Sequence, residues 1–246
     1  MDNFDRYFEQ AMRQLEETKN SQMSVVQLAA EKIADCIDNN GVVQLVGVDH
    51  GRSLGMELGY RAGGLMPFHE FKLQDLATRG LITREEYQPE VFNNEPAFAK
   101  MWLDAYRVEP EDMFIFTSRT GDEPVLNELA TMVKKNFPIY VVVSKTAAAK
   151  AKAEHPERPN LVDIADLVID TGTPEVDGLI EMKDGTRTSP VNTLCNNVLA
   201  QLITAETYRY LKNHEMDCPI LLSVNVTGAD EHNGKISQRY DGRWNS

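Results

Sequence analysis

The sequence is poor in cysteine, and the few cysteines it has form no motif. Cys36, Cys195 and Cys218 are the three cysteines in 246 residues, and no two of them form a C-x-x-C pair. An odd and scattered set argues against a disulfide framework and favours a reducing, cytoplasmic location. Cys36 and Cys195 fit better as small apolar fillers on helix faces than as nucleophiles.

Positive charge is also scarce. The chain has 25 Lys and Arg against 38 Asp and Glu, which gives a formal net charge of −13. Nucleic acid and anionic membranes both require a basic surface, so neither is expected as a partner. A small anionic ligand remains possible, because a local pocket can oppose the global charge.

Long apolar runs and metal-ligand spacings are absent as well. No run approaches the roughly 20 residues of a membrane span. The acidic start MDNFDRYFEQ lacks the basic and apolar regions of a signal peptide. No set of His, Cys, Asp and Glu has the spacing of a metal site, so we expect neither a metal nor another cofactor.

What the sequence does contain is an alternation of strand and helix patterns. Buried strands are predicted at 42–48, 113–118 and 139–144, with a weaker fourth at 165–170. Helical patterns lie between them at 53–62, 122–135 and 146–154. Strands alternating with helices indicate βαβ units, which build a parallel sheet covered by helices on both faces.

Further helical patterns flank this core. Residues 3–18 and 24–40 predict two amphipathic helices, with Gly41 at the C′ position of the second. The strongest helix pattern covers 189–214, where Ser189 is the predicted N-cap and Pro190 the first helical residue.

We expect one domain over residues 1–246. Its parts are an N-terminal helix over 1–20, a core over about 22–214 and a C-terminal extension over 215–246. Residues 66–110 do not fit the repeat, because they are too long for a simple crossover and contain another helical pattern near 96–107.

The segment after the second strand carries the most informative polar residues. Ligands of open parallel sheets bind beyond the carboxyl ends of the strands, and here Ser118-Arg119-Thr120-Gly121 follows a buried run. A phosphate could accept hydrogen bonds from the two hydroxyls and from N–H groups of the next helix, with Asp122 as predicted N-cap. A capped turn without a ligand has the same composition, and this alternative stays open.

The segment after the first strand does not match a nucleotide-binding motif. It contains Gly47, Gly51 and Gly55, but Asp49 occupies the place of the second glycine of G-x-G-x-x-G. No G-K-[ST] follows either, so a dinucleotide or nucleotide site is not favoured.

Together these elements resemble the sugar isomerase (SIS) domain family, whose second ligand loop has the pattern S-x-[ST]-G. The resemblance is closest to a subgroup of uncharacterised bacterial SIS proteins of about this length, labelled phosphosugar or phosphoheptose isomerases. The segments that carry it are YRAGGL (60–65), SRTG (118–121), ADLVIDTG (165–172), SPVNT (189–193), SVNVTGADEHN (223–233) and RYDGR (239–243).

The resemblance implies a three-layer αβα sandwich, flavodoxin-like, with a five-stranded parallel sheet. It also implies a sugar phosphate as ligand, a homodimer or homotetramer, and sites at subunit interfaces. The implied ligand-binding residues are Gly47, Asp49, Gly51, Arg52, Ser53, Ser118, Arg119, Thr120, Gly121, Ser189 and Thr193.

Two departures from the subgroup bear on the ligand. The first loop of the subgroup is of the G-x-G-H-S-H type, whereas this chain keeps His50 and replaces the following serine by Gly51. The pair Asp122-Glu123 replaces a more basic or amide-rich stretch.

Isomerisation of an aldose to a ketose needs a base that moves a proton between C1 and C2 and a group that opens the ring. The candidates are Glu57, His50, Glu231 and His232. A solvated helix face for Glu57 and a structural hydrogen bond for His232 remain as alternatives. Three functions stay open: a sugar-phosphate isomerase, a non-catalytic phosphosugar sensor, and a lyase that cleaves an ether on an amino-sugar phosphate.

Overall fold

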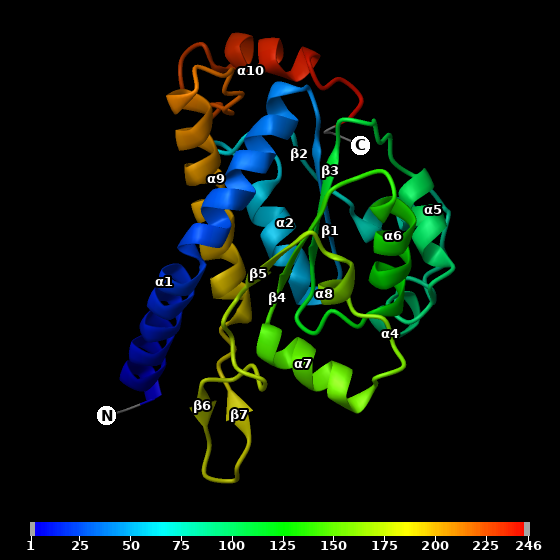
Figure 1. Cartoon of the computed structure of the whole chain (residues 1–246), viewed down its shortest axis with the longest axis vertical. Helices are drawn as coiled ribbons and strands as arrows, with labels where there is room; N and C mark the ends of the chain where they lie inside the picture. The colour runs from blue at the N-terminus through cyan, green and yellow to red at the C-terminus, as the bar shows by residue number, and fades with distance from the viewer. Residues whose placement is uncertain (1–2, 244–246) are drawn as a thin grey trace.

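A five-stranded parallel sheet forms the centre of the molecule in the computed structural model, which describes residues 3–243. The strand order is β2-β1-β3-β4-β5, and every pairing between neighbours is parallel (Figure 1). The strands are β1 (Val43–Gly47), β2 (Phe68–Glu70), β3 (Met113–Thr117), β4 (Ile139–Val143) and β5 (Leu167–Asp170). The predicted α/β fold is confirmed.

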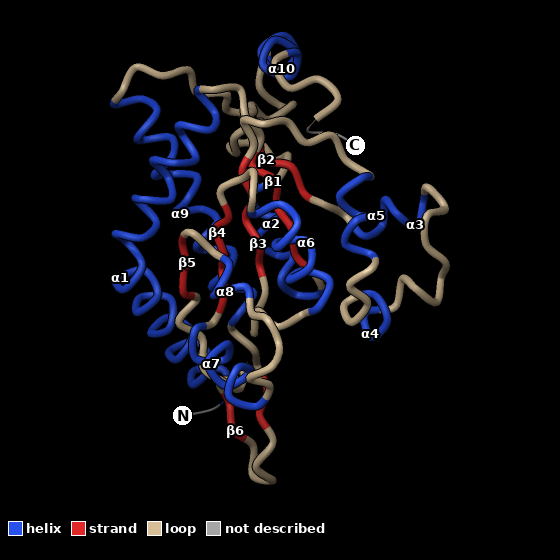
Figure 2. Tube along the Cα trace, turned by 45° about the vertical axis from the view of Figure 1, so that its right-hand side comes forward, coloured by secondary structure: helices blue, strands red, loops and turns tan. Residues whose placement is uncertain are grey.

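Helices cover both faces of the sheet, so the strands alternate between two buried clusters (Figure 2). One face carries α1 (Asn3–Asp38), α2 (Arg52–Leu58) and α9 (Asn192–Asn213). The other carries α5 (Phe98–Asp104), α6 (Pro124–Lys134), α7 (Lys145–Glu154) and α8 (Leu161–Ile164). Burial on both sides explains why β1, β3 and β4 read as continuous apolar runs.

The two helices predicted before β1 are one helix of 36 residues. No glycine or proline interrupts residues 19–23, and the buried side of this stretch is tied to the end of β5. Thr18 Oγ1 donates to the Thr171 carbonyl at 2.7 Å, and Gln22 Oε1 accepts from the Asp170 N–H at 2.9 Å. The prediction of a break was therefore wrong.

The C′ position of α1 lies one residue earlier than predicted. Asn40 has φ 63° and occupies the C′ position, and the Gly41 N–H donates to the Cys36 carbonyl at 2.8 Å. This is a Schellman cap, with Gly41 at C″. Gly41 is still required, because a Cβ there would collide with the Glu111 carbonyl oxygen.

The long segment between β1 and β3 contains the edge strand β2, which the pattern did not predict. It also holds α3 (Leu73–Thr78), α4 (Pro89–Phe92) and α5. Phe71, Phe92 and Trp102 are fully buried against the α6 side of the sheet. The segment is therefore part of the core.

Two predicted helix starts are wrong. In α6 the N-cap position is Glu123, since Pro124 is the first helical residue, so Asp122 lies outside the helix. In α9 the N-cap position is Val191, and Ser189 has φ 62°. Asp177 Oδ1 accepts the N–H groups of residues 191 and 192, so an acid far back in the chain does the capping. A small hairpin, β6 (Ile180–Glu181) and β7 (Arg187–Thr188), separates Asp177 from α9 and was not predicted.

The C-terminal extension packs on the edge of the sheet where the strands begin (Figure 1). Its helix α10 (Ala229–Gln238) is followed by Arg239 and Arg243. Arg239 donates to the Ile37 carbonyl at 2.7 Å, and Arg243 pairs with the buried Asp112 just before β3. Within residues 3–243 no helix is long and apolar enough to cross a bilayer.

Candidate functional site

Two loops meet at the carboxyl edge of the sheet, where the strand order reverses between β1 and β3. The first contains the short 3₁₀ helix η1 (Asp49–Gly51), and the second begins at Ser118. They are packed backbone to backbone, because a Cβ on Gly51 would be 2.6 Å from the Thr117 carbonyl oxygen. Such a switch point is the usual ligand site of this sheet topology.

The Ser118 turn, residues 118–123, is held closed by its own hydrogen bonds. Ser118 is 3% exposed, and its Oγ accepts the Gly121 N–H at 2.7 Å and donates to Glu123 Oε2 at 2.6 Å. Gly121 has φ 75°, which favours glycine, and a Cβ there would be 2.6 Å from Asn160 Oδ1. The Thr120 carbonyl accepts from Asn160 Nδ2 at 2.9 Å. The turn is thus preformed, but its serine is engaged within the chain.

Glu123 is the titratable group at the centre of this turn, and sequence reasoning did not select it. Burial raises its pKa to about 7, against the hydrogen bond from Ser118, and the charges of Asp122 and Asp49 raise it further. A carboxyl group with this pKa exchanges a proton near neutral pH. The available signal was its position directly before Pro124, since proline at the first helical residue places Glu123 at the N-cap.

The two arginines predicted to bind the ligand are committed to partners in the same chain. Arg52 pairs with Glu70 at the end of β2, where Nε and Nη2 each lie 3.0 Å from Oε1. Arg119 donates to the main-chain carbonyls of Pro174 and Glu175. Each guanidinium therefore has fewer N–H donors left for an anionic ligand.

The first loop borders a small cavity of about 170 Å³. Asp49 has φ 49°, and its Oδ2 accepts from Asn93 Nδ2 at 2.6 Å, while His50 is exposed. The lining residues are Gly47, Val48, Asp49, Arg52, Leu73, Tyr87, Gln88, Pro89 and Asn93. Five of these nine residues come from the segment 73–93, which carries no motif, so the sequence could not identify them.

The predicted residues on α2 lie at its contact with α9. Ser53 Oγ accepts from Asn196 Nδ2 at 3.1 Å. Glu57 accepts from Gln201 Nε2 at 2.6 Å and pairs with Arg61. Five residues of helix separate Glu57 from Arg52, so it lies about 7 Å further from the carboxyl edge along the helix axis.

Two further predicted residues, Ser189 and Thr193, lie just before and at the start of α9. The Ser189 carbonyl accepts the Leu179 N–H at 3.1 Å, which closes the β6–β7 hairpin. Thr193 lies in the first turn of α9 and is exposed.

Glu231 and His232 lie at the opposite edge of the sheet, in the first turn of α10 and not before it. His232 Nε2 is 2.8 Å from the Ile220 carbonyl oxygen, and Glu231 pairs with Lys235 at 2.7 Å. Both side chains are exposed. One chain therefore does not bring them together with Ser118.

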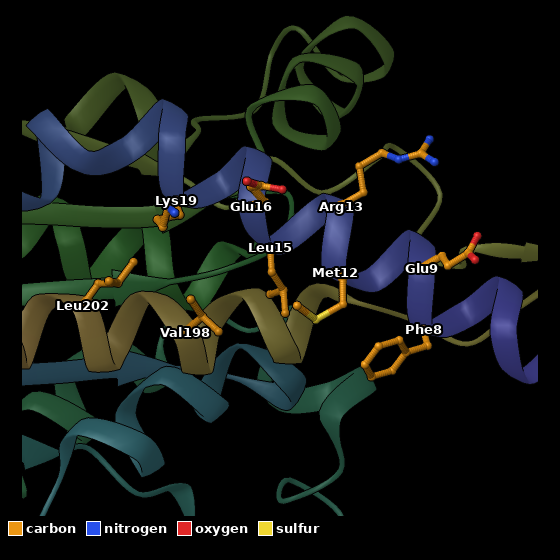
Figure 3. Close-up of a pocket in the computed structure, with 9 residues that line it drawn as sticks. All are labelled: Phe8, Glu9, Met12, Arg13, Leu15, Glu16, Lys19, Val198 and Leu202. Atoms are coloured by element: carbon orange, nitrogen blue, oxygen red, sulfur yellow. The ribbon is translucent and has the colours of Figure 1, made fainter.

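A groove of about 810 Å³ runs along α1 and α9 (Figure 3). Figure 3 shows Phe8, Met12 and Leu15 of α1 on the side of Val198 and Leu202 of α9. Phe8 is 62% exposed and Met12 is 52% exposed. An open stripe of exposed apolar side chains suits contact with another protein surface better than catalysis.

Among residues 3–243, no three His, Cys, Asp or Glu side chains cluster as a metal site. The chemistry available at the carboxyl edge is that of hydroxyls, carboxyl groups, backbone N–H groups and the exposed imidazole of His50.

The topology and the two loops define a protein of the SIS fold class, with its candidate ligand site at the carboxyl edge. Residues 6–143, more than half of the chain, match the SIS domain family, and the chain belongs to this family. A phosphoheptose isomerase from Francisella tularensis has the same fold, with a TM-score of 0.51 at 15% identity over 82% of this chain and 98% of that chain.

The chain is also similar to UPF0309 proteins over nearly its whole length. One from Listeria monocytogenes serotype 4b is 28% identical over 97% of this chain and 96% of its own. One from Geobacillus thermodenitrificans is 24% identical over 97% of this chain and 95% of its own.

Proposed function

We propose that this chain binds a sugar phosphate at its carboxyl edge and interconverts an aldose and a ketose by proton transfer. The observation that carries the proposal is the close packing of Gly51 on Thr117, which joins the first loop to the Ser118 turn at the switch point. Membership of the SIS family and the SIS fold support it.

In this proposal the phosphate binds at the Ser118 turn. The hydroxyls of Ser118 and Thr120 are its proposed donors. The sugar then extends toward the cavity beside Asp49, whose carboxylate and whose neighbour His50 can hydrogen-bond sugar hydroxyls.

The acid–base groups are drawn from two places. Glu57, oriented by Gln201, is the proposed base that moves the proton between C1 and C2. Glu231 and His232 can serve only the site of a second copy, because in one chain they lie at the far edge of the sheet. The functional unit is therefore proposed to be a homodimer or homotetramer.

A non-catalytic phosphosugar sensor is the second candidate. It is favoured by the internal engagement of residues predicted to bind the phosphate, since Ser118, Arg52 and Arg119 all have partners within the chain.

A two-stage experiment tests the proposal. Aldose and ketose phosphates are first screened by thermal shift, and the hits are then incubated with the protein in D₂O and followed by NMR. An isomerase incorporates deuterium at C1 or C2 of the sugar and forms the second isomer, whereas a sensor binds without exchange. Ser118→Ala should weaken binding about tenfold to a hundredfold, because a hydrogen bond to a charged group contributes about 1.5–3 kcal/mol.

Glu57→Gln is the catalytic variant. It should retain ligand binding and lose deuterium exchange. Unchanged binding by a folded Ser118→Ala protein would place the ligand elsewhere, and wild-type protein that binds but never exchanges would leave only the sensor.

A further inference from the structure

The Ser118 hydroxyl has a single proton, and in this structure it is already used. Ser118 Oγ donates to Glu123 Oε2 at 2.6 Å, and one of its lone pairs accepts the Gly121 N–H at 2.7 Å. A hydroxyl has one donor and two acceptor positions, so only an acceptor position remains. A phosphate offers acceptors and needs donors. The turn as it stands therefore cannot offer this hydroxyl to an anion.

Protonation of Glu123 reverses this hydrogen bond. A neutral carboxyl group can donate to the remaining lone pair of Ser118 Oγ, and the Ser118 O–H is then free to turn toward a ligand. The backbone does not need to move, since the same two oxygen atoms stay in contact. The Gly121 N–H bond to the same oxygen is kept.

The surrounding charges make an ionised Glu123 and a bound anion incompatible. Asp49 of η1 and Asp122 of the turn both act on Glu123 with negative charge. Arg52 is neutralised by Glu70, and Arg119 donates to main-chain carbonyls and not to Glu123. A like charge beside a half-buried carboxylate such as Glu123 favours its neutral form.

We propose that an anion enters the Ser118 turn only together with one proton, which Glu123 holds while it donates to Ser118. The proposal rests on the proposed function, because it concerns the same site and its phosphate. The proton comes from solvent, or from the ligand itself when the ligand is a phosphate monoanion. No covalent bond forms or breaks. Burial keeps the pKa of Glu123 at about 7, so this proton is available near neutral pH.

Glu123 then determines the pH range in which the site accepts an anion. A phosphate monoester keeps its second acidic proton, which it can share with the carboxyl group, only below a pKa of about 6. Above neutral pH a phosphate dianion and a sulfate each need one proton from solvent. The affinities for both should therefore fall in parallel as the pH rises, and Glu123→Gln should remove this dependence.

Inorganic sulfate is the best probe, because it does not titrate between pH 5 and pH 9 and any pH dependence belongs to the protein. Sulfate is titrated by calorimetry into wild type, Glu123→Gln, Ser118→Ala and Glu128→Gln at pH 6, 7, 8 and 9. Glu128 is an exposed residue of the same helix, so its variant is the matched control for lost charge. The same titration of wild type at pH 8, in two buffers of different ionisation enthalpy, counts protons taken up.

The expected results are specific for each protein. The sulfate Kd of wild type and of Glu128→Gln should rise about tenfold per pH unit above pH 7, as linkage to one proton requires. Glu123→Gln should have a Kd that is constant over the same range, because an amide can donate to Ser118 at every pH. Uptake at pH 8 should be close to one proton per sulfate.

The outcomes separate this inference from the proposed function. A pH-independent sulfate Kd in wild type, with binding lost in Ser118→Ala, would overturn the proton coupling and leave the phosphate site in place. Equal binding by wild type and Ser118→Ala would overturn both. No sulfate binding by wild type at pH 6 would overturn the inference, whereas sugar phosphates could still bind elsewhere. Proton counting needs no variant, so a Glu123→Gln protein that fails to fold does not remove the test.

Discussion

Replacement of Gly51 by alanine should force apart the two loops that form the candidate site. Gly51 has φ −58° and ψ −31°, which any residue adopts, so alanine adds no backbone strain. The added methyl group, however, would lie 2.6 Å from the Thr117 carbonyl oxygen and 3.3 Å from its carbonyl carbon. The substitution therefore tests how closely the two backbones pack, once the general effect of replacing glycine by alanine has been subtracted.

The size of the effect follows from this geometry. An ordinary contact begins near 3.4 Å, so the loops must separate by about 0.8 Å at this point. Overpacking of a buried site by one methyl group costs about 1–3 kcal/mol. With a urea m-value of about 3 kcal/mol/M, the unfolding midpoint should fall by about 0.3–1 M.

Gly234→Ala is the matched control, because it makes the same change inside a helix with no heavy atom within 4 Å of the new Cβ. Alanine is favoured over glycine in a helix interior by about 0.5–1 kcal/mol, so this variant should be slightly stabilised. The reasoning is refuted if Gly51→Ala unfolds at the wild-type midpoint, or if both variants shift in the same direction.

Three further predictions concern stability and catalysis. Burial lowers the pKa of His69 to about 4, so between pH 6.5 and pH 4 His69 is protonated in the unfolded chain and neutral in the folded chain. As the pH is lowered from 6.5 to 4, the free energy of unfolding of wild type should fall relative to that of His69→Gln by a total on the order of 3 kcal/mol, measured by urea unfolding at several pH values. Arg243→Met should cost about 3–5 kcal/mol, because it leaves the charge of the buried Asp112 unpaired, and an unchanged melting temperature would contradict this. Gln201→Leu should lower kcat more than it raises KM if Gln201 orients Glu57. The Asn side chain is one methylene group shorter than that of Gln, so full activity of Gln201→Asn would argue against a role of this hydrogen bond in positioning.

The central strands could be predicted because each is a run of five buried residues, apolar through most of its length, that ends at a polar turn. β1, β3 and β4 all have this form. β2 could not be predicted in the same way, since three residues in register with β1 leave no periodic signal. Its place in the sheet depends on Phe71 and Trp102, which bury the segment that follows it.

Helix starts failed for a different reason. The caps of α9 come from Asp177, which is 14 and 15 residues from the N–H groups that it accepts. A nearby Ser189-Pro190 pair has the local pattern of a cap, but the hairpin leaves Ser189 with φ 62° instead. Capping rules consider only residues next to the helix start, so they cannot predict a cap such as Asp177 that is distant in sequence and close only in the folded chain.

The Ser118 turn was predicted, but its internal state was not. The pattern S-x-[ST]-G identifies a turn after a buried strand, and Gly121 has the positive φ that such a turn needs. Whether the serine offers its proton to a ligand depends on the 2.6 Å contact with Glu123, which is set by how α6 begins. The sequence also could not predict on which edge of the sheet α10 packs, because the motif around His232 does not distinguish the edge where the strands begin from the edge where they end.

If α10 serves the Ser118 turn of another copy, the symmetry of the assembly is constrained. A two-fold axis must bring the far edge of each copy beside the carboxyl edge of the other, so the two sheets run antiparallel, side by side. The groove along α1 and α9 is an exposed apolar surface that could form such a contact. Met12→Glu should therefore give a monomer by light scattering and abolish sugar-phosphate isomerisation, while sulfate still binds at the Ser118 turn. A monomeric Met12→Glu protein with wild-type turnover would show that Glu231 and His232 take no part in the reaction.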